Sequence, residues 1–153
     1  MAMTRNVTQA YTGFAKLAER LHEAGKLDAA QYEAAVTHQK QYGMRIEEAL
    51  MEVQAISEGE LLKFLASHYR TRFVSTEKLA KADVDRLTLD KVPRKFAEQH
   101  QIFPVLYDPQ GQALSVVTPD PDNLEALREL QMISSLREVR AFVARPYAVK
   151  AAI

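Results

Sequence analysis

The residues of this chain that are suited to catalysis are four histidines, two adjacent carboxylates and one Gly-Lys pair. Paired carboxylates can act as general acid and base, and a Gly-Lys pair can close a phosphate-binding loop. Glu47 and Glu48 share one helical turn, where acidic pairs usually form a solvated face. Gly25-Lys26 lacks the upstream glycine and the following Ser or Thr of a phosphate loop. Neither pair therefore predicts an active site.

The histidines are scattered along the chain, each near the end of a predicted helix, as solvent-facing or capping residues usually are. No G-x-S-x-G, H-E-x-x-H or dinucleotide-binding glycine pattern occurs. The chain has no cysteine, which excludes disulfides, thiolate zinc sites and a cysteine nucleophile. We therefore predict no catalytic residue and no metal site. The four histidines are His22, His38, His68 and His100.

The composition is that of an ordinary globular protein, with 153 residues of which 47% are hydrophobic. The 20 Lys and Arg residues balance the 20 Asp and Glu residues, which removes the usual electrostatic argument for nucleic-acid binding. No apolar run approaches the roughly 18–20 residues that span a bilayer. The N-terminus lacks the apolar core of a signal peptide. We predict a soluble, cytoplasmic protein.

The first half of the chain reads as amphipathic helices. An apolar stripe over residues 14–24 predicts a helix that ends at Gly25, a C-cap glycine. Asp28 is placed to cap the next helix, which ends near Gln39. The inward-facing residues of these two helices are Phe14, Leu17, Leu21, Ala24, Tyr32, Ala35 and Val36.

The same pattern returns 29 residues later, and the second copy has a capping box, Ser57-x-x-Glu60. Two copies of one helix-turn-helix unit predict a compact pseudo-symmetric bundle, because a solenoid needs more repeats. The equivalent pairs are Lys16 and Arg45, Leu17 and Ile46, Leu21 and Leu50, Leu27 and Ile56, Asp28 and Ser57, Tyr32 and Leu61, and Val36 and Leu65.

The second half alternates helix and strand, and all the prolines lie there. We predict a helix that begins near Val92 and a hairpin with Pro104 in an edge strand. The expected order is a helix to 100, strands at 102–107 and 113–117, a helix at 123–133 capped by Asp122 with Leu124, Leu127 and Leu130 buried, a strand at 139–144 and a helix at 147–153.

The predicted fold class is therefore α+β. A helical tandem-repeat bundle, residues 1–75 with repeats 16–39 and 45–68, precedes a small α+β unit with a three-stranded sheet, residues 76–153.

The tandem repeat also resembles a known family. Two motifs of 24 residues, separated by the five-residue spacer 40–44, follow the pattern R-L-G-x-x-L-x-x-x-G-x6-L-x-x-x-L-x-x-Q in their spacing. This is the pattern of the MshEN or GspE-N type of N-terminal domain in type II secretion and type IV pilus assembly ATPases, which binds cyclic di-GMP. The second half is similar to the same region in the stretches Leu89–Pro93, Phe96-Ala97, Phe103–Val105 and Thr118–Leu124.

The resemblance implies a ligand site in which arginine stacks on or fork-bonds a guanine or phosphate and leucines face the bases. The family's glycines let the ligand approach the backbone. The residues carried over are Lys16, Leu17, Leu21, Gly25, Gln39, Arg45, Ile46, Leu50, Leu65 and Asp120.

The chain departs from the pattern where Lys16 replaces Arg, Ala18 and Glu47 replace the first Gly, Gln54 the second Gly, and His68 the last Gln. Glu47 puts a negative charge where a dianionic ligand comes nearest, which costs more than Arg45 returns. The alternative explanation for the apolar matches is that these residues are the core of the bundle.

The resemblance implies a non-catalytic regulatory and protein-interaction domain. It would dock onto the cytoplasmic domain of an inner-membrane platform protein or onto the ATPase itself, and so lie in the cytoplasm at that membrane. The ATPase core lies C-terminal to this region in the family, so we predict no enzyme activity.

Three alternatives to this interpretation remain. The first is a cyclic di-GMP receptor, with that dinucleotide as the only expected ligand. The second, a nucleic-acid-binding helix-turn-helix, is disfavoured because residues 29–39 and 58–68 carry few cations. The third is that the basic stretch from Arg137 to Arg145 meets an acidic partner or lipid headgroups; we favour the solvated face of an edge strand.

Overall fold

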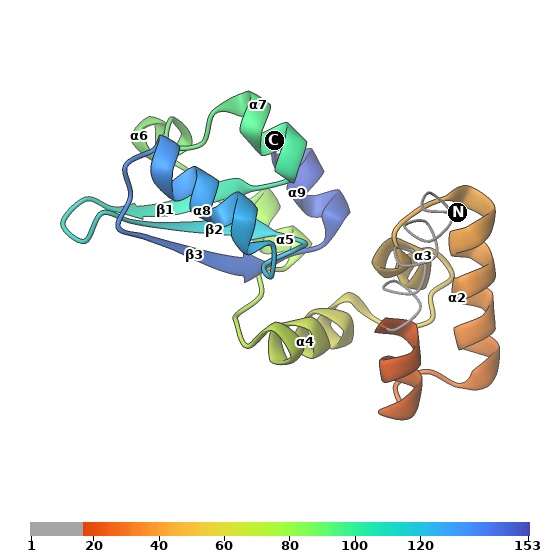
Figure 1. Cartoon of the computed structure of the whole chain (residues 1–153). Helices are drawn as coiled ribbons and strands as arrows, with labels where there is room; N and C mark the ends of the chain where they lie inside the picture. The colour runs from red at the N-terminus through yellow and green to blue at the C-terminus, as the bar shows by residue number, and fades with distance from the viewer. Residues whose placement is uncertain (1–16) are drawn as a thin grey trace, which may run out of the picture. The chain divides into compact units, whose positions relative to one another are not determined.

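The computed structural model describes residues 17–153, and Lys16 and Phe14 lie outside the described residues (Figure 1). Its contacts divide the chain into two compact units, residues 1–61 and 62–153. The fold is α+β, as predicted, with a three-stranded sheet in the second unit. The elements are α2 Ala29–Tyr42, α3 Ile46–Glu52, α4 Glu58–Tyr69, α5 Thr76–Ala80, α6 Arg86–Leu89, α7 Arg94–His100, β1 Phe103–Asp108, β2 Ala113–Thr118, α8 Leu124–Ile133, β3 Glu138–Val143 and α9 Pro146–Ala152.

The first unit is helical, and its local signals act as predicted. Residues 17–23 are helical, and Gly25 follows with a φ of +75°. Asp28 caps α2 through a full capping box with Gln31, whose two hydrogen bonds are 2.7 and 2.9 Å long. The helix α2 packs against α3. Ala24, which we expected to face inward, is exposed because the helix has already ended there.

The two copies of the repeat end their first helices with the same backbone hydrogen bonds. In the first copy, the Lys26 amide donates to the Leu21 carbonyl at 2.9 Å. In the second, the Ala55 amide donates to the Leu50 carbonyl at 3.0 Å. Gln54 stands where the first copy has its glycine and still adopts a φ of +55°. The 29-residue repeat is therefore a structural repeat as well as a sequence repeat.

The second unit is built on a sheet with the strand order β1-β2-β3. The strands β1 and β2 form the expected antiparallel hairpin, and β3 runs parallel to β2 because α8 provides the crossover. The strand β1 lies at an edge, as Pro104 predicted, and its register shifts between Pro104 and Leu106.

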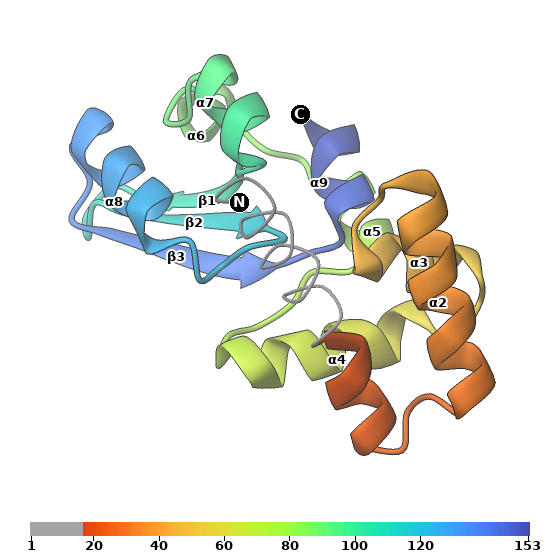
Figure 2. The same cartoon turned by 45° about the vertical axis from the view of Figure 1, so that its right-hand side comes forward.

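Helices cover both faces of this sheet (Figures 1 and 2). The helices α7 and α8 lie on one face, where Phe96, Leu127 and Leu130 pack against Leu114 and Val116 of β2. On the other face α5 and α9 contribute Leu79, Ala148 and Val149, which surround Val117. The central strand is fully buried as a result.

Three local predictions in this unit were wrong. The helix expected from Val92 begins at Arg94, because Pro93 takes the N-cap position, and the separate short helix α6 precedes it. The cap of α8 is Asn123 rather than Asp122, since the Asn123 side chain accepts from the Ala126 amide at 3.3 Å.

The third error concerns the buried stripe of α8. Leu124 is 57% exposed, and Ala126 is buried together with Leu127 and Leu130. Leu124 is the first residue of α8, so its side chain lies at the end of the helix, outside the buried stripe of Ala126, Leu127 and Leu130.

The segment after α4 is tied to the sheet. The Val143 amide donates to the Arg72 carbonyl at 2.9 Å, and the Val74 amide donates to the Val143 carbonyl at 3.0 Å. The Thr71 hydroxyl donates to the Ala141 carbonyl at 2.7 Å. We predicted the boundary between the domains after residue 75, whereas the contacts of the structure divide the chain within α4.

Candidate functional site

The centre of the candidate site is an ion pair between Arg45 and Glu47. Two guanidinium nitrogens of Arg45, Nη2 and Nε, donate to the same carboxylate oxygen at 2.7 and 3.1 Å. The Glu47 side chain is 5% exposed and the Arg45 side chain 26% exposed. We expected Glu47 on a solvated face, and this was wrong.

Local backbone geometry explains the pair. Arg45 is the N-cap residue of α3 with an extended backbone, φ −67° and ψ 148°, and Glu47 lies in the first turn. Residues two apart on a helix do not face each other, but an extended first residue can turn its side chain back over the turn. The position equivalent to Glu47 in the first copy is Ala18, which is completely buried. The repeat therefore places a carboxylate where its other copy has only a methyl group.

Most of the apolar candidates are core residues in the structure, as the alternative interpretation expected. Leu17 is half-buried, and Gly25 occupies the exposed turn after the first helix. The candidate site residues that are at least nine-tenths buried are Leu21, Gln39, Ile46, Leu50 and Leu65.

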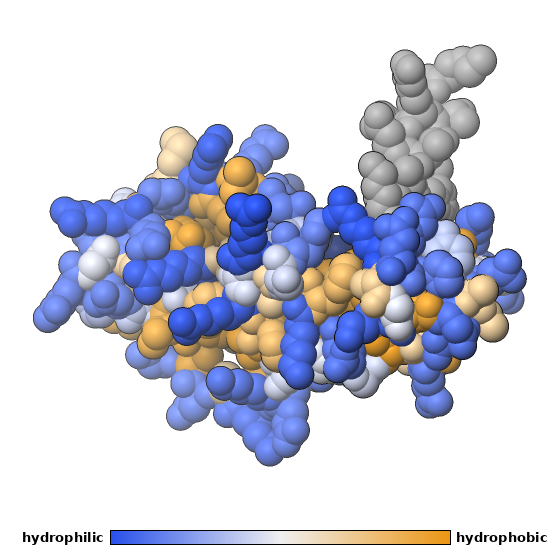
Figure 3. All heavy atoms as spheres, turned by 90° about the horizontal axis from the view of Figure 1, so that it is seen from below, coloured by the Kyte–Doolittle hydropathy of each residue, from blue (hydrophilic) through white to orange (hydrophobic). Residues whose placement is uncertain are grey.

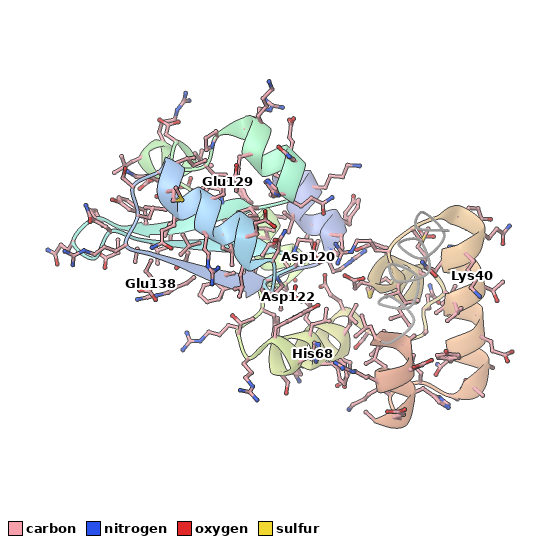
Figure 4. All side chains as sticks on the ribbon, viewed as in Figure 1. Lys40, His68, Asp120, Asp122, Glu129 and Glu138 are labelled. Atoms are coloured by element: carbon pink, nitrogen blue, oxygen red, sulfur yellow. The ribbon has the colours of Figure 1, made fainter. Side chains whose placement is uncertain are left out.

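The candidates do not all belong to one unit. Leu65 is in the part of α4 that belongs to the second unit. Asp120 is half-buried in the loop between β2 and α8 of that unit (Figure 4). Lys16 lies outside the described residues. The other described candidates belong to the first unit: Leu17, Leu21, Gly25, Gln39, Arg45, Ile46 and Leu50.

Sequence reasoning missed that Glu47 is the partner of Arg45, because the pattern shows only their separation along the chain. It also missed His38, whose Nε2 lies 2.5 Å from a carboxylate oxygen of Glu52 and so links α2 to α3. The other histidines are spread out, as expected. The Nδ1 atom of His22 lies 2.8 Å from the Leu27 carbonyl oxygen, and His100 lies 3.8 Å from Glu129.

The shifted pKa values lie outside the candidate site. Hydrogen bonds from the Thr88 side chain and backbone hold the pKa of Asp85 below its ordinary value. The hydrogen-bonded pair of Glu138 and Arg140 lowers the pKa of Glu138 and raises the pKa of Arg140. The three titratable groups are exposed, and their shifts reflect hydrogen bonds to residues two or three positions away in the sequence. They do not indicate a second site.

Two other kinds of site are absent from residues 17–153. No group of three or more His, Asp or Glu side chains in this range is arranged to hold a metal ion. None of the helices described is long and apolar enough to cross a membrane.

Comparison with known proteins gives a family and a fold. A family model described as the MshEN domain matches residues 69–153. A solved structure of MshE with cdg is 25% identical and has a TM-score of 0.65, covering 88% of this chain and 94% of that chain. No curated protein matches the sequence.

Two structures of the N-terminal domain of XpsE share the fold. One is 17% identical with a TM-score of 0.58, covering 89% of this chain and 90% of that one. The other is 20% identical with a TM-score of 0.51, covering 99% and 94%.

The matched residues 69–153 make up more than half of the chain and include the whole sheet and the helices that cover it. The likeness to MshE extends beyond them to most of the chain. The chain therefore belongs to the MshEN domain family, the N-terminal domain type of type II secretion and type IV pilus assembly ATPases.

Proposed function

We propose that this chain is a non-catalytic docking and regulatory domain that binds the cytoplasmic domain of an inner-membrane platform protein. Family membership supports a role in a secretion or pilus assembly system. The observation that carries the choice of docking over ligand sensing is the buried ion pair of Arg45 and Glu47. That pair already neutralises the cation to which the family resemblance assigns an anionic ligand.

A phosphate that took over the Nε and Nη2 donors of Arg45 would have to displace the Glu47 carboxylate. Glu47 is 96% buried as a residue, so it would lose its counterion in a poorly solvated place. Separating this pair costs about 2–3 kcal/mol, less than for a fully buried pair because Arg45 is partly exposed, and that cost cancels what a single new phosphate contact returns. The motif thus keeps its fold, while Glu47 rather than a ligand neutralises the positive charge of Arg45.

Binding of the purified cytoplasmic domain of the cognate platform protein tests this proposal. We expect calorimetry to show binding without any nucleotide, and to give the same affinity when cyclic di-GMP is added. Binding that appears only with the nucleotide would instead establish the receptor function. A platform domain that binds in neither condition would contradict docking.

The second candidate function is a cyclic di-GMP receptor. The likeness to MshE with cdg favours it, since it covers 88% of this chain. The turn geometry favours it too, because Gly25 and Gln54, which stand at the second glycine position of the two copies, both have a positive φ. In this function Arg45 binds a phosphate or a guanine after Glu47 turns away.

Titration of three proteins with cyclic di-GMP separates the two functions. The docking proposal expects no heat and no thermal shift from the wild type, and binding gained in Glu47→Gly. The receptor function expects heat from the wild type and its loss in Arg45→Ala. Identical binding by wild type and Arg45→Ala would refute the site assignment.

The proposed location is the cytoplasmic side of the inner membrane, reached through the partner. Apolar and hydrophilic side chains are interspersed on the surface seen in Figure 3. The two units differ in the sign of their net charge. The first has six Lys and Arg against nine Asp and Glu, and the second has 14 against 11. The neutrality of the whole chain therefore conceals a basic second unit, which is suited to an acidic partner.

A further inference from the structure

Two adjoining hollows lie on the second unit where α7, the start of β1 and the C-terminal turn of α9 meet. Their volumes are about 320 and 310 Å³. Arg94 and Ile153 line both of them, so the two hollows adjoin, and we call the pair the α7–α9 groove. Figures 1 and 2 show α7 and α9, which belong to opposite faces of the sheet, next to each other.

The groove has an apolar floor and a basic rim. Leu89, Ala97, Phe103 and Pro104 line one hollow together with Ile153. Leu89 is 37% exposed, which leaves apolar surface available to a partner. Concave apolar surface of this kind, with a few polar groups around it, is typical of binding sites.

Three cations and two carboxylates line the hollows around the floor: Arg86, Arg94, Lys150, Asp90 and Glu98. Arg86 pairs with Asp90 at 3.2 Å and Arg94 with Glu98 at 3.0 Å, each within one helical turn. These pairs are more than half exposed and therefore weak. Lys150 makes no ion pair with an acidic residue of the described chain, and the unit that carries it has a surplus of three positive charges. The rim therefore favours a negatively charged partner.

The edges of the sheet are poorly suited to binding a partner strand. The strand β1 has Pro104 and an irregular register at its edge. The strand β3 carries the Glu138–Arg140 ion pair and is hydrogen-bonded to residues 72 and 74. Proline, register shifts and charges are devices that prevent strand addition. A helix laid into an apolar groove is an established mode of recognition that needs no sheet edge.

We infer that the α7–α9 groove binds an acidic amphipathic helix of the partner protein, an inference that rests on the proposed docking function. Apolar side chains one turn apart on such a helix are separated by about 5–6 Å and fill the two adjoining hollows. Glutamate or aspartate residues on its flanks face Lys150 and Arg86. The apolar contacts give affinity, and the charges select the partner and its direction.

The test uses the whole chain labelled with ¹⁵N and a synthetic helical peptide of about 18 residues, long enough to form a helix. The peptide carries leucines at positions i, i+3 and i+7 and glutamates on both flanks. We expect amide shifts at Leu89, Ala97 and Phe103, and at least tenfold weaker binding by a peptide with lysine flanks. Shifts that map elsewhere, or no binding, would overturn the inference.

A matched pair of charge reversals locates the site. Lys150→Glu should weaken peptide binding about tenfold, because a close pair of opposite charges at an interface contributes about that much to affinity. Arg137→Glu reverses an exposed cation of the same unit that does not line the groove, and should change binding less than twofold. Equal binding by wild type and Lys150→Glu would contradict the groove assignment. Both positions are exposed, so the variants should fold, and circular dichroism checks this.

The same two variants, titrated with the platform domain, separate the groove from the proposed function. If the platform domain binds wild type and Lys150→Glu equally, the groove inference is wrong and docking stands. If the peptide binds in the groove but the platform domain does not bind, the docking proposal is wrong and the groove remains a site for acidic helices.

Discussion

The two copies of the repeat have the same backbone and different chemistry. Both end their first helix with the same hydrogen bonds and begin their second with a side-chain cap on the amide three residues later. They differ at the position after Leu17 and Ile46, where one copy has the buried Ala18 and the other the buried Glu47. The comparison teaches that capping and turn signals preserve a fold independently of the residues that would bind a ligand.

The largest expected effect tests whether the equivalent leucines are core residues. Leu21 and Leu50 are both completely buried, so Leu21→Ala and Leu50→Ala should each lower the free energy of unfolding by about 3 kcal/mol. Urea denaturation measures both values. If either substitution costs less than 1 kcal/mol, that leucine is not part of the core, and the ligand role becomes the better explanation.

The next effect tests the chemistry that only the second copy has. Arg45→Ala leaves the Glu47 carboxylate buried without its counterion and should cost about 2–3 kcal/mol, which is less than for a fully buried pair because Arg45 is partly exposed. The double variant Arg45→Ala/Glu47→Ala should lose clearly less than the sum of the two single losses. Additive losses in this double-mutant cycle would show that the pair does not interact.

The third prediction compares how much the helix N-cap of each copy contributes to stability. Asp28→Ala and Ser57→Ala each remove a side chain that accepts from a backbone amide, at 2.7 and 3.2 Å respectively. Each should cost about 1 kcal/mol, with Asp28→Ala the greater because its capping box is complete. Thermal unfolding of both variants measures the difference. A larger loss in Ser57→Ala would reverse this ranking.

The smallest effect tests the two turns. Gln54 adopts a left-handed conformation that favours glycine, so Gln54→Gly should stabilise the chain by about 0.5 kcal/mol. Gly25→Ala places a side chain in the same conformation and should destabilise by about 1 kcal/mol. Denaturation midpoints compare them. The same sign for both changes would mean that the turns are not equivalent.

Local signals in the sequence predicted much of the fold. Gly25 and Asp28 mark a helix end and a helix start, and Pro104 marks an edge strand, because each acts through the backbone of its immediate neighbours. The cap of α8 was less certain, since Asp122 and Asn123 are adjacent and both are good caps. The exposure of Leu124 depends on which side chains cover the first turn of α8, which the spacing of leucines does not show.

The sequence by itself determined the helical repeat, the hairpin, the three strands and the family resemblance, because periodicity, caps and turn residues are local properties. Only the tertiary structure decided that Glu47 is buried against Arg45, that residues 71–74 join the sheet, and that α7 and α9 enclose a groove. Those features depend on which surfaces meet in space. Whether the Glu47 carboxylate pairs with Arg45 or repels an anionic ligand depends on where the Arg45 side chain lies. The backbone conformation of Arg45 decides this, and the sequence motif does not show it.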